Sequence, residues 1–562
     1  MGQGMNRRSW IKGAAKGAAG LAAAGWLAGT PLNTYAQQAG IGVWDPRRFG
    51  ARGDGASKDT QALQQAIDAC ASAGGGVVSL SPGRYLTGTL VLKSHVELNL
   101  QAGAVLLGSR DMGDYTLPAE ALTALKGVLV QHLIFALRQQ DIAITGQGVI
   151  DGQCQIAPNG VPEPSPDNAW KEVEGAHWKL VHYISPMVEL GECSRVRVEG
   201  VTLQNSAGWT LRPVACNSVL IRGVKVRNPF NIPNSDGIDP TGCQNVQIVD
   251  CDVETGDDAI CVKTFNPYGP TPVSRNIEVW NCRINTTCNG FKVGVEGYGG
   301  FQNITFRDSE IICTADKINE RAIGGVSVEM TDNGWIDGVS ISNITMKNVR
   351  APIFVRLQNS YKKKDAMMSG RLQNVKISNI RATGAIMASS ITGIPGSPVR
   401  GITLENIQIS TDEPGQMAWK GSVVPDTPNG YPESKMFGRL PSFGLYCRHA
   451  ESIALNDVHF HSNVGDPRAT LHFEDVNGLT LTDVDATGTA NPQAFVELQN
   501  VQNASIERCV ALEPAAVYAA ISGSASQNIA FGENDLRKVR MPAQVRQDVP
   551  ANAVQVKSRP SH

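Results

Sequence analysis

The sequence predicts an all-β fold, a single-stranded right-handed parallel β-helix with an N-terminal capping helix. Three observations lead to this prediction. A short phrase of alternating apolar residues recurs along most of the chain. Glycine is abundant, with 58 residues, which suits a fold that makes a tight turn in every coil. Helical periodicity is found in one stretch near the N-terminus and is absent from the repeats.

The repeated phrase is a polar residue or Asn, then apolar-x-apolar, one or two polar residues, and apolar-x-apolar again. Its first apolar residues are roughly 23 to 31 positions apart in the best copies, at Val196, Val219, Val246, Ile277 and Ile304. Alternation with period two indicates strands with one buried face. Two such short strands bury that face only by stacking on the next copy, in parallel.

Two other repeat architectures fit less well. A propeller blade needs four antiparallel strands with hairpin turns, and an αβ repeat needs helical periodicity. The Asn residues at the corners of the phrase are expected to hydrogen-bond along the stack as an Asn ladder.

The N-terminal end of the solenoid is expected to carry a cap. Asp59 is expected to cap a helix over residues 60–73, with Leu63, Ala66, Ile67 and Cys70 on one face. A run of three glycines after Ala73 ends the helix. Terminal coils of a solenoid need covering, so this helix is expected to plug the open end of the coil.

The first 36 residues have the layout of a twin-arginine signal peptide. Arg7 and Arg8 precede a weakly apolar, Gly- and Ala-rich stretch that contains Lys16, and Thr34-Tyr35-Ala36 offers a small-residue cleavage site. A membrane anchor would need about 20 strongly apolar residues, which this stretch lacks. We therefore expect export to the periplasm or the medium.

Removal of residues 1–36 would leave one β-helix domain over residues 37–548 and a polar tail over residues 549–562. The formal net charge of −2 gives no bulk attraction to nucleic acid or to an anionic membrane. The 12 cysteines form no CxxC pair and have no His partners at zinc spacing, so they are expected to be buried small side chains. We expect a monomer without cofactor or metal, acting on a polysaccharide or oligosaccharide.

Two long departures from the repeat are expected to be loops on the binding face. They are Gln153–Ser185 and Thr411–Leu445, and both carry more aromatic residues than the strands. These aromatic residues are expected either to stack on sugars or to pack the loops.

Acidic residues concentrate in two segments about one coil apart, Asn234–Asp239 and Thr255–Lys263. The spacing places Asp236 and Asp257 on adjacent rungs of one face. Adjacent aspartates such as Asp257 and Asp258 repel each other unless they meet a cation, a metal or a chemical role. The structural alternative, an aspartate that makes turn hydrogen bonds, is assigned here to Asp239 and Asp250.

These segments resemble glycoside hydrolase family 28, the polygalacturonase family, whose motifs include Asn-Thr-Asp and Gly-Asp-Asp. The resemblance covers most of residues 44–410. It implies a pectin-lyase-like β-helix and inverting hydrolysis of α-linked galacturonic-acid polysaccharides such as pectin. It also implies that Asp257 protonates the leaving oxygen while Asp236 and Asp258 position and deprotonate the attacking water.

The chain departs from two family motifs. The usual Gly-His-Gly is Cys288-Asn289-Gly290, and the usual Arg-Ile-Lys is Ser327-Val328-Glu329, which removes both substrate-binding cations. By strand parity Lys292 and Arg356 face out of the coil, where they would either grip a substrate carboxylate or pair with a glutamate. The candidate substrate-binding residues are Asn234, Lys263, Asn289, Lys292, Glu329 and Arg356.

An anion at Glu329 would repel a galacturonate carboxylate. The sequence therefore favours exo attack, or attack on modified or branched pectin, over random cleavage of long homogalacturonan. The alternatives are a rhamnogalacturonan hydrolase of the same family, a calcium-dependent pectate-lyase-type β-eliminase, and a non-catalytic glycan-binding β-helix. Clustered aspartates argue against the last of these.

Overall fold

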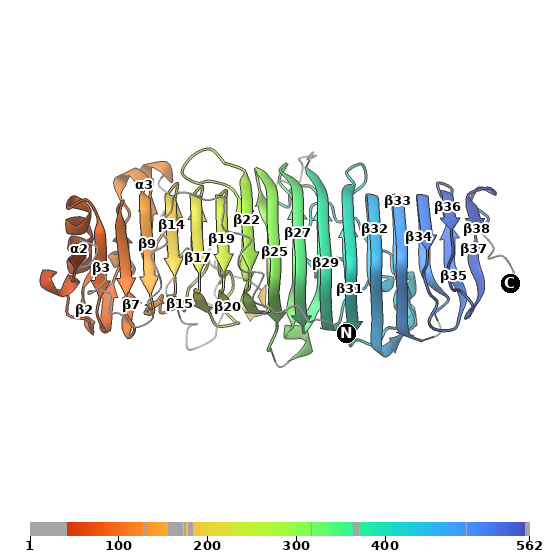
Figure 1. The fold of residues 1–562 in the computed structure, drawn as a ribbon, viewed down its shortest axis with the longest axis horizontal. Helices are drawn as coiled ribbons and strands as arrows, with labels where there is room; N and C mark the ends of the chain where they lie inside the picture. Colours follow the sequence, from red (N-terminus) through yellow and green to blue (C-terminus); the bar gives the residue numbers. More distant parts are fainter. Residues whose placement is uncertain are drawn as a thin grey trace, which may run out of the picture.

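The computed structural model describes residues 42–126, 130–154, 184–315, 317–362, 370–490 and 492–556, with the backbone of two short strands between residues 172 and 177. The chain winds into one long right-handed parallel β-helix, in which successive coils lie side by side from α2 to the C-terminal strands (Figure 1). The predicted fold class is thus confirmed. The predicted signal peptide, residues 1–36, lies outside the described residues.

Each full coil contributes to three parallel sheets, which we name the A, B and C faces. The A face contains the first strand of the repeated phrase. Its strands pair in the order β1 (Val43–Trp44), β3 (Gly76–Leu80), β6 (Val96–Leu100), β9 (Gln140–Gly146), β14 (Ser194–Glu199), β17 (Asn217–Arg222), β19 (Gln244–Val249), β22 (Ser274–Trp280), β25 (Gly300–Ile312), β27 (Trp335–Lys347), β29 (Arg371–Ala385), β31 (Val399–Thr411), β32 (Ser442–Asp466), β33 (Ala469–Thr489), β34 (Ala494–Glu507), β36 (Gln527–Phe531) and β38 (Val554–Val556).

The B face contains the second strand of the phrase and merges with the A-face strands from β25 onward. Its strands are β2 (Asp54–Lys58), β4 (Gly83–Thr87), β7 (Ala104–Gly108), β10 (Val149–Asp151), β15 (Thr202–Gln204), β18 (Lys225–Arg227), β20 (Asp252–Thr255) and β23 (Arg283–Thr286).

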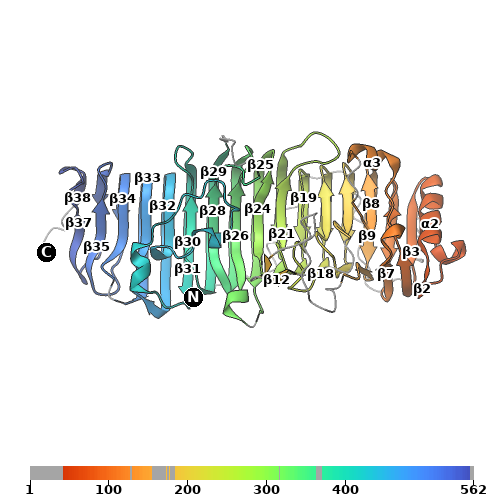
Figure 2. The same cartoon turned by 180° about the vertical axis from the view of Figure 1, so that it is seen from behind.

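The C face lies on the far side of the molecule from the view of Figure 1 and is seen in Figure 2. The first parts of β32, β33 and β34 belong to it. Its other strands are β5 (Leu90–Val91), β8 (Ile134–Leu137), β13 (Val188–Gly191), β16 (Leu211–Val214), β21 (Ile260–Thr264), β24 (Asn289–Gly297), β26 (Ala322–Met330), β28 (Val349–Leu357), β30 (Ser389–Thr392), β35 (Ala515–Ser522) and β37 (Val539–Val545).

Few elements lie outside these faces. An antiparallel pair stands apart, β11 (Glu172–Val173) with β12 (Ala176–His177). The helices are α2 (Thr60–Ser72), α3 (Ala119–Ala124) and the 3-10 turns η2 (Pro46–Phe49), η3 (Met112–Asp114), η4 (Ile318–Glu320), η5 (Met417–Gly421) and η6 (Ser434–Phe437). No helix in the described part of the chain is long and apolar enough to cross a membrane.

The core consists of the alternate apolar residues of the phrase, stacked in register. Val196, Val219, Val246, Ile277 and Ile304 pair along the A face, and all are buried. Full burial of each such side chain stabilises the fold by roughly 1.5–3 kcal/mol. Each coil therefore depends on its neighbours for its hydrophobic stabilisation, as the repeat predicted.

The predicted Asn ladder is present at the corner before these strands. The side-chain amides of Asn245, Asn276 and Asn303 each donate to the Asn of the preceding coil, at 2.8, 3.0 and 3.2 Å. These residues have φ of 57°, 56° and 54°, the left-handed conformation that Asn tolerates better than most side chains. Asn thus serves both the turn and the stack.

The N-terminal cap agrees with the prediction in its extent and buried face, with one correction. Helix α2 buries Leu63, Ala66, Ile67 and Cys70 against the first coil. Asp59, however, makes no side-chain bond to the helix. Its carboxylate instead accepts the backbone N–H groups of Arg52 and Gly53, at 2.7 and 3.0 Å, and so fixes the turn that precedes the helix.

The C-terminal boundary differs from the expectation of a tail beginning at residue 549. Val549 and Ala553 are buried in the core, and β38 pairs with β36. The coil therefore continues to Val556. All 12 cysteines are free and buried, which agrees with the role expected for them.

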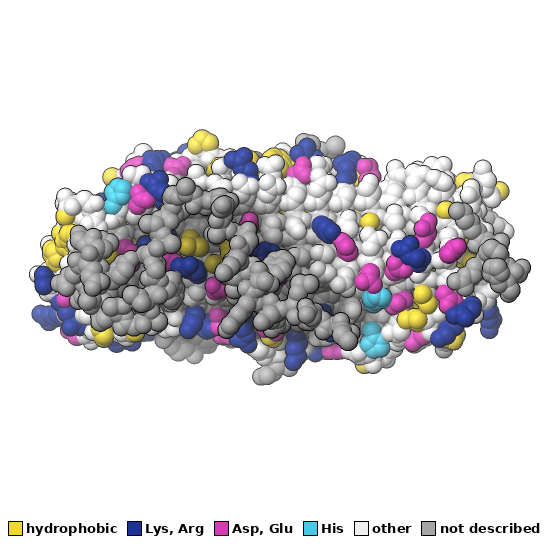
Figure 3. Space-filling model, in the orientation of Figure 1, with side chains coloured by type: hydrophobic (Ala, Val, Ile, Leu, Met, Phe, Trp, Pro, Cys, Tyr) yellow, Lys and Arg dark blue, Asp and Glu magenta, His cyan; other side chains and the backbone are white. Residues whose placement is uncertain are grey.

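Charged side chains of both signs are interspersed over the uncovered part of the A face in Figure 3. Several pair across neighbouring strands, such as Lys376 with Glu405 at 2.6 Å and Arg400 with Glu451 at 2.8 Å.

Candidate active site

Three aspartates come together where the chain passes from the B face to the C face. Ile238 pairs with Ile260 in parallel, and the backbone N–H of Gly237 donates to the carbonyl of Asp258 at 2.9 Å. Asp236 therefore stacks on Asp258 one rung away. Each of the aspartates Asp236, Asp257 and Asp258 is only 3 % exposed. The two acidic segments lie on adjacent rungs as predicted, but the residue opposite Asp236 is Asp258 and not the expected Asp257.

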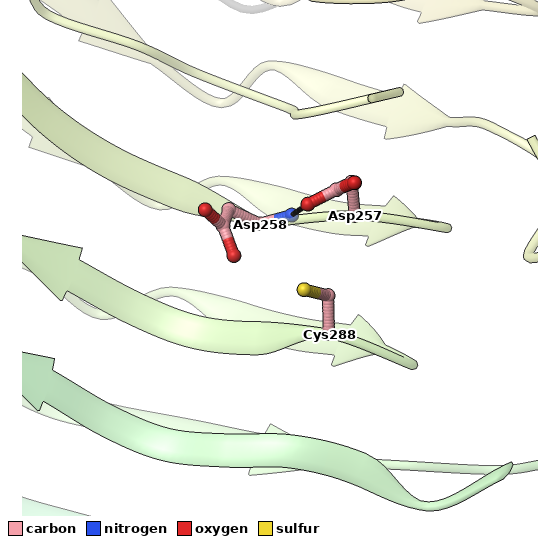
Figure 4. Close-up of side chains that lie close together, drawn as sticks. All are labelled: Asp257, Asp258 and Cys288. Carbon is pink, nitrogen blue, oxygen red and sulfur yellow. Dashed lines mark hydrogen bonds between the residues drawn. The ribbon is translucent and has the colours of Figure 1, made fainter. Parts of the chain in front are cut away.

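Asp257 is held by backbone donors. Its two carboxylate oxygens accept the N–H groups of Asn234 and Asp258, at 3.0 and 2.9 Å. Figure 4 shows the Asp257 and Asp258 carboxylates on one rung, directed differently, because the chain turns between them. A side chain at Gly256 would lie within 2.8 Å of three backbone carbonyl oxygens, so only glycine fits the turn that precedes the pair.

Asp258 has a different set of partners, drawn from the next rungs of the C face. Its Oδ1 accepts the Nδ2–H of Asn289 at 2.7 Å, and the Asn289 Oδ1 accepts the hydroxyl of Ser327 at 3.0 Å. Its Oδ2 lies 3.3 Å from the Nζ of Lys292. Asn289 and Ser327, two of the residues that depart from the family motifs, thus form a chain that ends on Asp258.

The ammonium group of Lys292 lies between two carboxylates. Lys292 is buried, and its Nζ is 3.4 Å from Glu329 as well as 3.3 Å from Asp258. Burial disfavours its charge, but the carboxylates of Asp258 and Glu329 outweigh that effect and raise the pKa of Lys292. We infer that Lys292 compensates charge inside the site, which is the second of the two roles expected for it, pairing with a glutamate.

Glu329 requires a correction as well. The sequence suggested an anion lining the substrate subsite, but Glu329 is 0 % exposed. Burial raises its pKa to about 8, and the charges of Asp258 and Glu433 add to that rise while Lys292 opposes it. A buried, largely protonated Glu329 presents no charge to a substrate at neutral pH.

Lys263 stands to Asp236 as Lys292 stands to Asp258. Its Nζ lies 3.3 Å from both Asp236 and Glu296 and 4.7 Å from the ring centroid of Trp209. The site therefore contains two buried lysines, each in contact with one aspartate and one glutamate.

The guanidinium group of Arg356 is buried among backbone carbonyls. Arg356 is 1 % exposed, and its guanidinium donates to the carbonyls of Gly393 at 2.8 Å, Asp426 at 2.6 Å and Thr427 at 3.3 Å. Burial lowers the pKa of Arg356 to about 9. Parity placed this side chain outside the coil correctly, but the segment after β31 covers it. The structure thus assigns Arg356 to holding that segment in place of gripping substrate.

Two further expectations concern polar residues beside the carboxylates. Asn234 contacts Asp257 through its backbone N–H, and among the described residues its buried Oδ1 has no hydrogen-bond partner.

Asp239 makes no side-chain turn bonds within the described chain, contrary to its assignment. Burial, reinforced by the charge of Asp236, raises the pKa of Asp239 well above its usual range. Asp250 does accept a corner bond, from Asn281 at 2.5 Å.

The insertion Thr411–Leu445 lies over the C face, in front of β28 and β30 in Figure 2. Its backbone reaches Asn359 through the carbonyl of Pro428, at 3.0 Å. Of its aromatic residues, Phe437 and Phe443 are buried, whereas Tyr431 is exposed and lies 5.5 Å from the Nζ of Lys292. The packing role is therefore found for Phe437 and Phe443, and Tyr431 is exposed beside the site. The aromatic residues of Gln153–Ser185 lie outside the described residues.

Lys362 is a residue near the site that the sequence reasoning missed. It follows β28 on the C face, and its Nζ lies 3.9 Å from Glu296, which also contacts Lys263. Parity gave no reason to select it, because it stands beyond the strand. The available signal was a run of three lysines after Tyr361 in an insertion between two repeats.

One group of potential metal ligands is present in the described part of the chain: Asp257, Asp258 and Cys288, with ligand atoms within 4.8 Å of one another. Cys288 comes from the rung next to the aspartates (Figure 4). Calcium prefers six to eight oxygen ligands, and a thiol with two carboxylates offers a poor match. Lys292 already supplies a positive charge to Asp258. The residues present do not fit the calcium site of an eliminase.

A large groove of about 1190 Å³ lies elsewhere, on the A face across β9, β14, β17 and β19. Its lining includes cross-strand ion pairs such as Arg195 with Asp141 at 2.6 Å. It contains none of the candidate site residues.

Comparisons with known proteins agree with this geometry. The family model described as glycosyl hydrolases family 28 matches residues 119–427, which include all three aspartates. A model described as rhamnogalacturonase A/epimerase, pectate lyase-like, matches residues 46–113. A probable polygalacturonase of Vitis vinifera is 28% identical over 400 residues, covering 67% of this chain and 75% of the relative.

Two solved structures share the fold. A family 28 exopolygalacturonase of Yersinia enterocolitica has a TM-score of 0.58 and 19% identity, covering 78% of each chain. A hyperthermoactive exopolygalacturonase of Thermotoga maritima has a TM-score of 0.57 and 23% identity, covering 75% of this chain and 91% of its own. Because the family model spans more than half of the sequence, this chain belongs to family 28 of the glycosyl hydrolases and is a glycosidase.

Proposed function

We propose that the protein is an inverting hydrolase of α-linked galacturonic-acid polysaccharide, with Asp257 as the general acid and Asp236 and Asp258 as the water-activating pair. The observation that carries the proposal is the different environment of these carboxylates. Asp236 and Asp258 each lie 3.3 Å from a buried lysine ammonium, and two backbone N–H groups donate to the Asp257 carboxylate.

The buried lysines distinguish the proposed water-activating pair, Asp236 and Asp258, from the proposed general acid, Asp257. An ammonium group close to a carboxylate favours its ionised form, which is the form that accepts a proton from water. Asp236 and Asp258 stack on neighbouring rungs, so a water molecule between them would meet two bases. Inversion requires that water on the face of the sugar opposite the general acid.

The position of the insertion supports attack near chain ends. Tyr431 and the neighbouring backbone stand over the C face beside Lys292, on the C-terminal side of the aspartates along the coil axis. An insertion in that position would limit how far a bound sugar chain extends past the aspartates on that side. The Vitis relative is a probable polygalacturonase, which supports galacturonate as the sugar. We infer exo attack on short or modified pectin.

The first test concerns the general acid. Asp257→Asn keeps the shape of the side chain and removes its proton, so we expect turnover of oligogalacturonate to fall by at least about a thousandfold. The matched control is Asp250→Asn, an aspartate of the same coil that bonds only the corner ladder, which should keep normal turnover. Near-normal hydrolysis by a folded Asp257→Asn variant would overturn the assignment of roles.

The second test follows the products. Proton NMR during the first turnovers should show the β anomer released from the α-linked substrate, and the viscosity of long polygalacturonate should fall slowly while small units accumulate. An α anomer would contradict inversion, and rapid loss of viscosity would contradict exo attack. Faster hydrolysis of rhamnogalacturonan than of polygalacturonate would identify a rhamnogalacturonan hydrolase. An unsaturated product would identify a β-eliminase.

A further inference from the structure

Three lysines at or near the aspartates differ sharply in their access to solvent. The side chains of Lys263 and Lys292 are 4 % and 1 % exposed, and each is flanked by two carboxylates at 3.3–3.4 Å. Lys362 is 42 % exposed and lies 3.9 Å from Glu296, a carboxylate already 3.3 Å from Lys263. A substrate can therefore reach the ammonium group of Lys362, whereas the other two are enclosed.

Lys362 is connected to both water-side aspartates. One path runs from Lys362 to Glu296, then to Lys263, and then to Asp236. Each step joins a cation to an anion, so the charges alternate along the path. The Lys362 ammonium is the end of this path that is exposed to solvent.

The second path is aromatic. The Lys362 Nζ lies 5.2 Å from the ring of Tyr361, which makes an edge contact with Tyr431 at 5.1 Å. Tyr431 in turn lies 5.5 Å from the Nζ of Lys292, whose other neighbour is Asp258. Tyr361 follows β28, Tyr431 lies between β31 and β32, and Lys292 lies within β24, so these contacts join three separate segments of the chain.

The rings of Tyr298 and Tyr361 flank the Lys362 ammonium group, and Tyr431 contacts Tyr361. Tyr298 and Tyr431 are 46 % and 42 % exposed, and the ring of Tyr298 lies 5.6 Å from the Lys362 Nζ. An exposed ring with a polar tip provides an apolar surface for the face of a sugar and a hydroxyl for hydrogen bonding. A cation beside such rings matches a sugar that carries a carboxylate.

We propose that Lys362, with Tyr298, Tyr361 and Tyr431, forms a subsite that binds the carboxylate of an acidic sugar next to the cleaved bond. Lys362 is the specificity-determining residue of this subsite, because a neutral sugar gains nothing from its charge. Glu296 holds the ammonium at the rim, and the tyrosines support the sugar ring. This inference rests on the proposed function, since the acidic sugar is part of the proposed substrate.

The kinetic experiment uses trigalacturonate and the full-length protein. Lys362→Met should raise KM about tenfold with kcat changed by less than about threefold, because one charge-assisted contact is lost and the aspartates are untouched. Lys362→Arg should restore KM to within about threefold of wild type. Lys376→Met, an exposed lysine paired with Glu405 on the A face, is the matched control and should behave as wild type. An unchanged KM, or a failure of Lys362→Arg to restore it, overturns the subsite.

A binding experiment separates failure of the subsite from failure of the proposed function. Galacturonate and galactose differ at the carboxylate, and neither contains a bond to hydrolyse. Wild type should bind galacturonate at least about fivefold more tightly than galactose, and Lys362→Met should lose that preference. A preference that survives in Lys362→Met, or is absent from wild type, overturns the subsite. A wild type with the preference but without hydrolysis of trigalacturonate keeps the subsite and overturns the proposed function.

Discussion

Replacing the buried Glu329 by Gln should make stability less dependent on pH. In the folded protein burial raises the pKa of Glu329 to about 8, against an ordinary value of 4.5. The charged groups that face it are Lys292, Asp258 and Glu433. Between these two pH values the folded state retains a proton that the unfolded chain releases, so stability is fully present below pH 4.5 and falls as pH rises toward 8.

The size of the effect follows from the same values. Each pH unit in this window costs about 1.4 kcal/mol, so by pH 7 the folded protein has lost about 3 kcal/mol relative to pH 4.5. Glutamine has nearly the same shape and no proton to retain. Glu329→Gln should therefore match wild type near pH 4.5 and exceed its stability by about 3 kcal/mol at pH 7.

The assay is urea unfolding followed by tryptophan fluorescence at pH 5, 6, 7 and 8. Glu405→Gln, an exposed glutamate paired with Lys376, is the control and should show the wild-type dependence on pH. Parallel curves for wild type and Glu329→Gln would refute the reasoning. Because Glu329 is enclosed, KM for trigalacturonate should stay within about twofold of wild type. A large fall in KM would instead show that Glu329 faces the substrate.

Three other predictions test individual assignments. Asn289→Ala removes the 2.7 Å bond to Asp258, so kcat should fall about 10- to 100-fold with little change in KM; an unchanged kcat would exclude a role in orienting Asp258. Arg356→Met should lower the midpoint of thermal unfolding by several degrees, because three carbonyls of covering segments lose their donor, and equal midpoints would contradict this. Arg7→Lys combined with Arg8→Lys should leave precursor in the cytoplasm on cell fractionation, and normal export would refute a twin-arginine signal.

Much of the fold could be predicted because its information is local and repeated. Alternation at period two sets which side chains face the core, and the spacing of copies such as those at Val219 and Val246 sets the stacking register. The same phase argument placed the two acidic segments on neighbouring rungs, although the register sets Asp236 opposite Asp258 and not opposite Asp257, the aspartate that the spacing had selected. A helix of ordinary length with one apolar face made α2 predictable as well.

The partners of the outward-facing residues were decided only by the tertiary structure. Parity assigns a side chain to the inside or the outside of the coil, but it does not say which insertion covers the outside. Arg356 points outward and is covered by the segment after β31, whereas Lys362 lies beyond its strand and stays accessible. The side chains of Lys292 and Glu329 face outward and contact each other at 3.4 Å. Sequence by itself determined the coil and the three aspartates. The folded chain decided which cation a substrate can reach, because burial by distant segments depends on where insertions pack and carries no periodic signal.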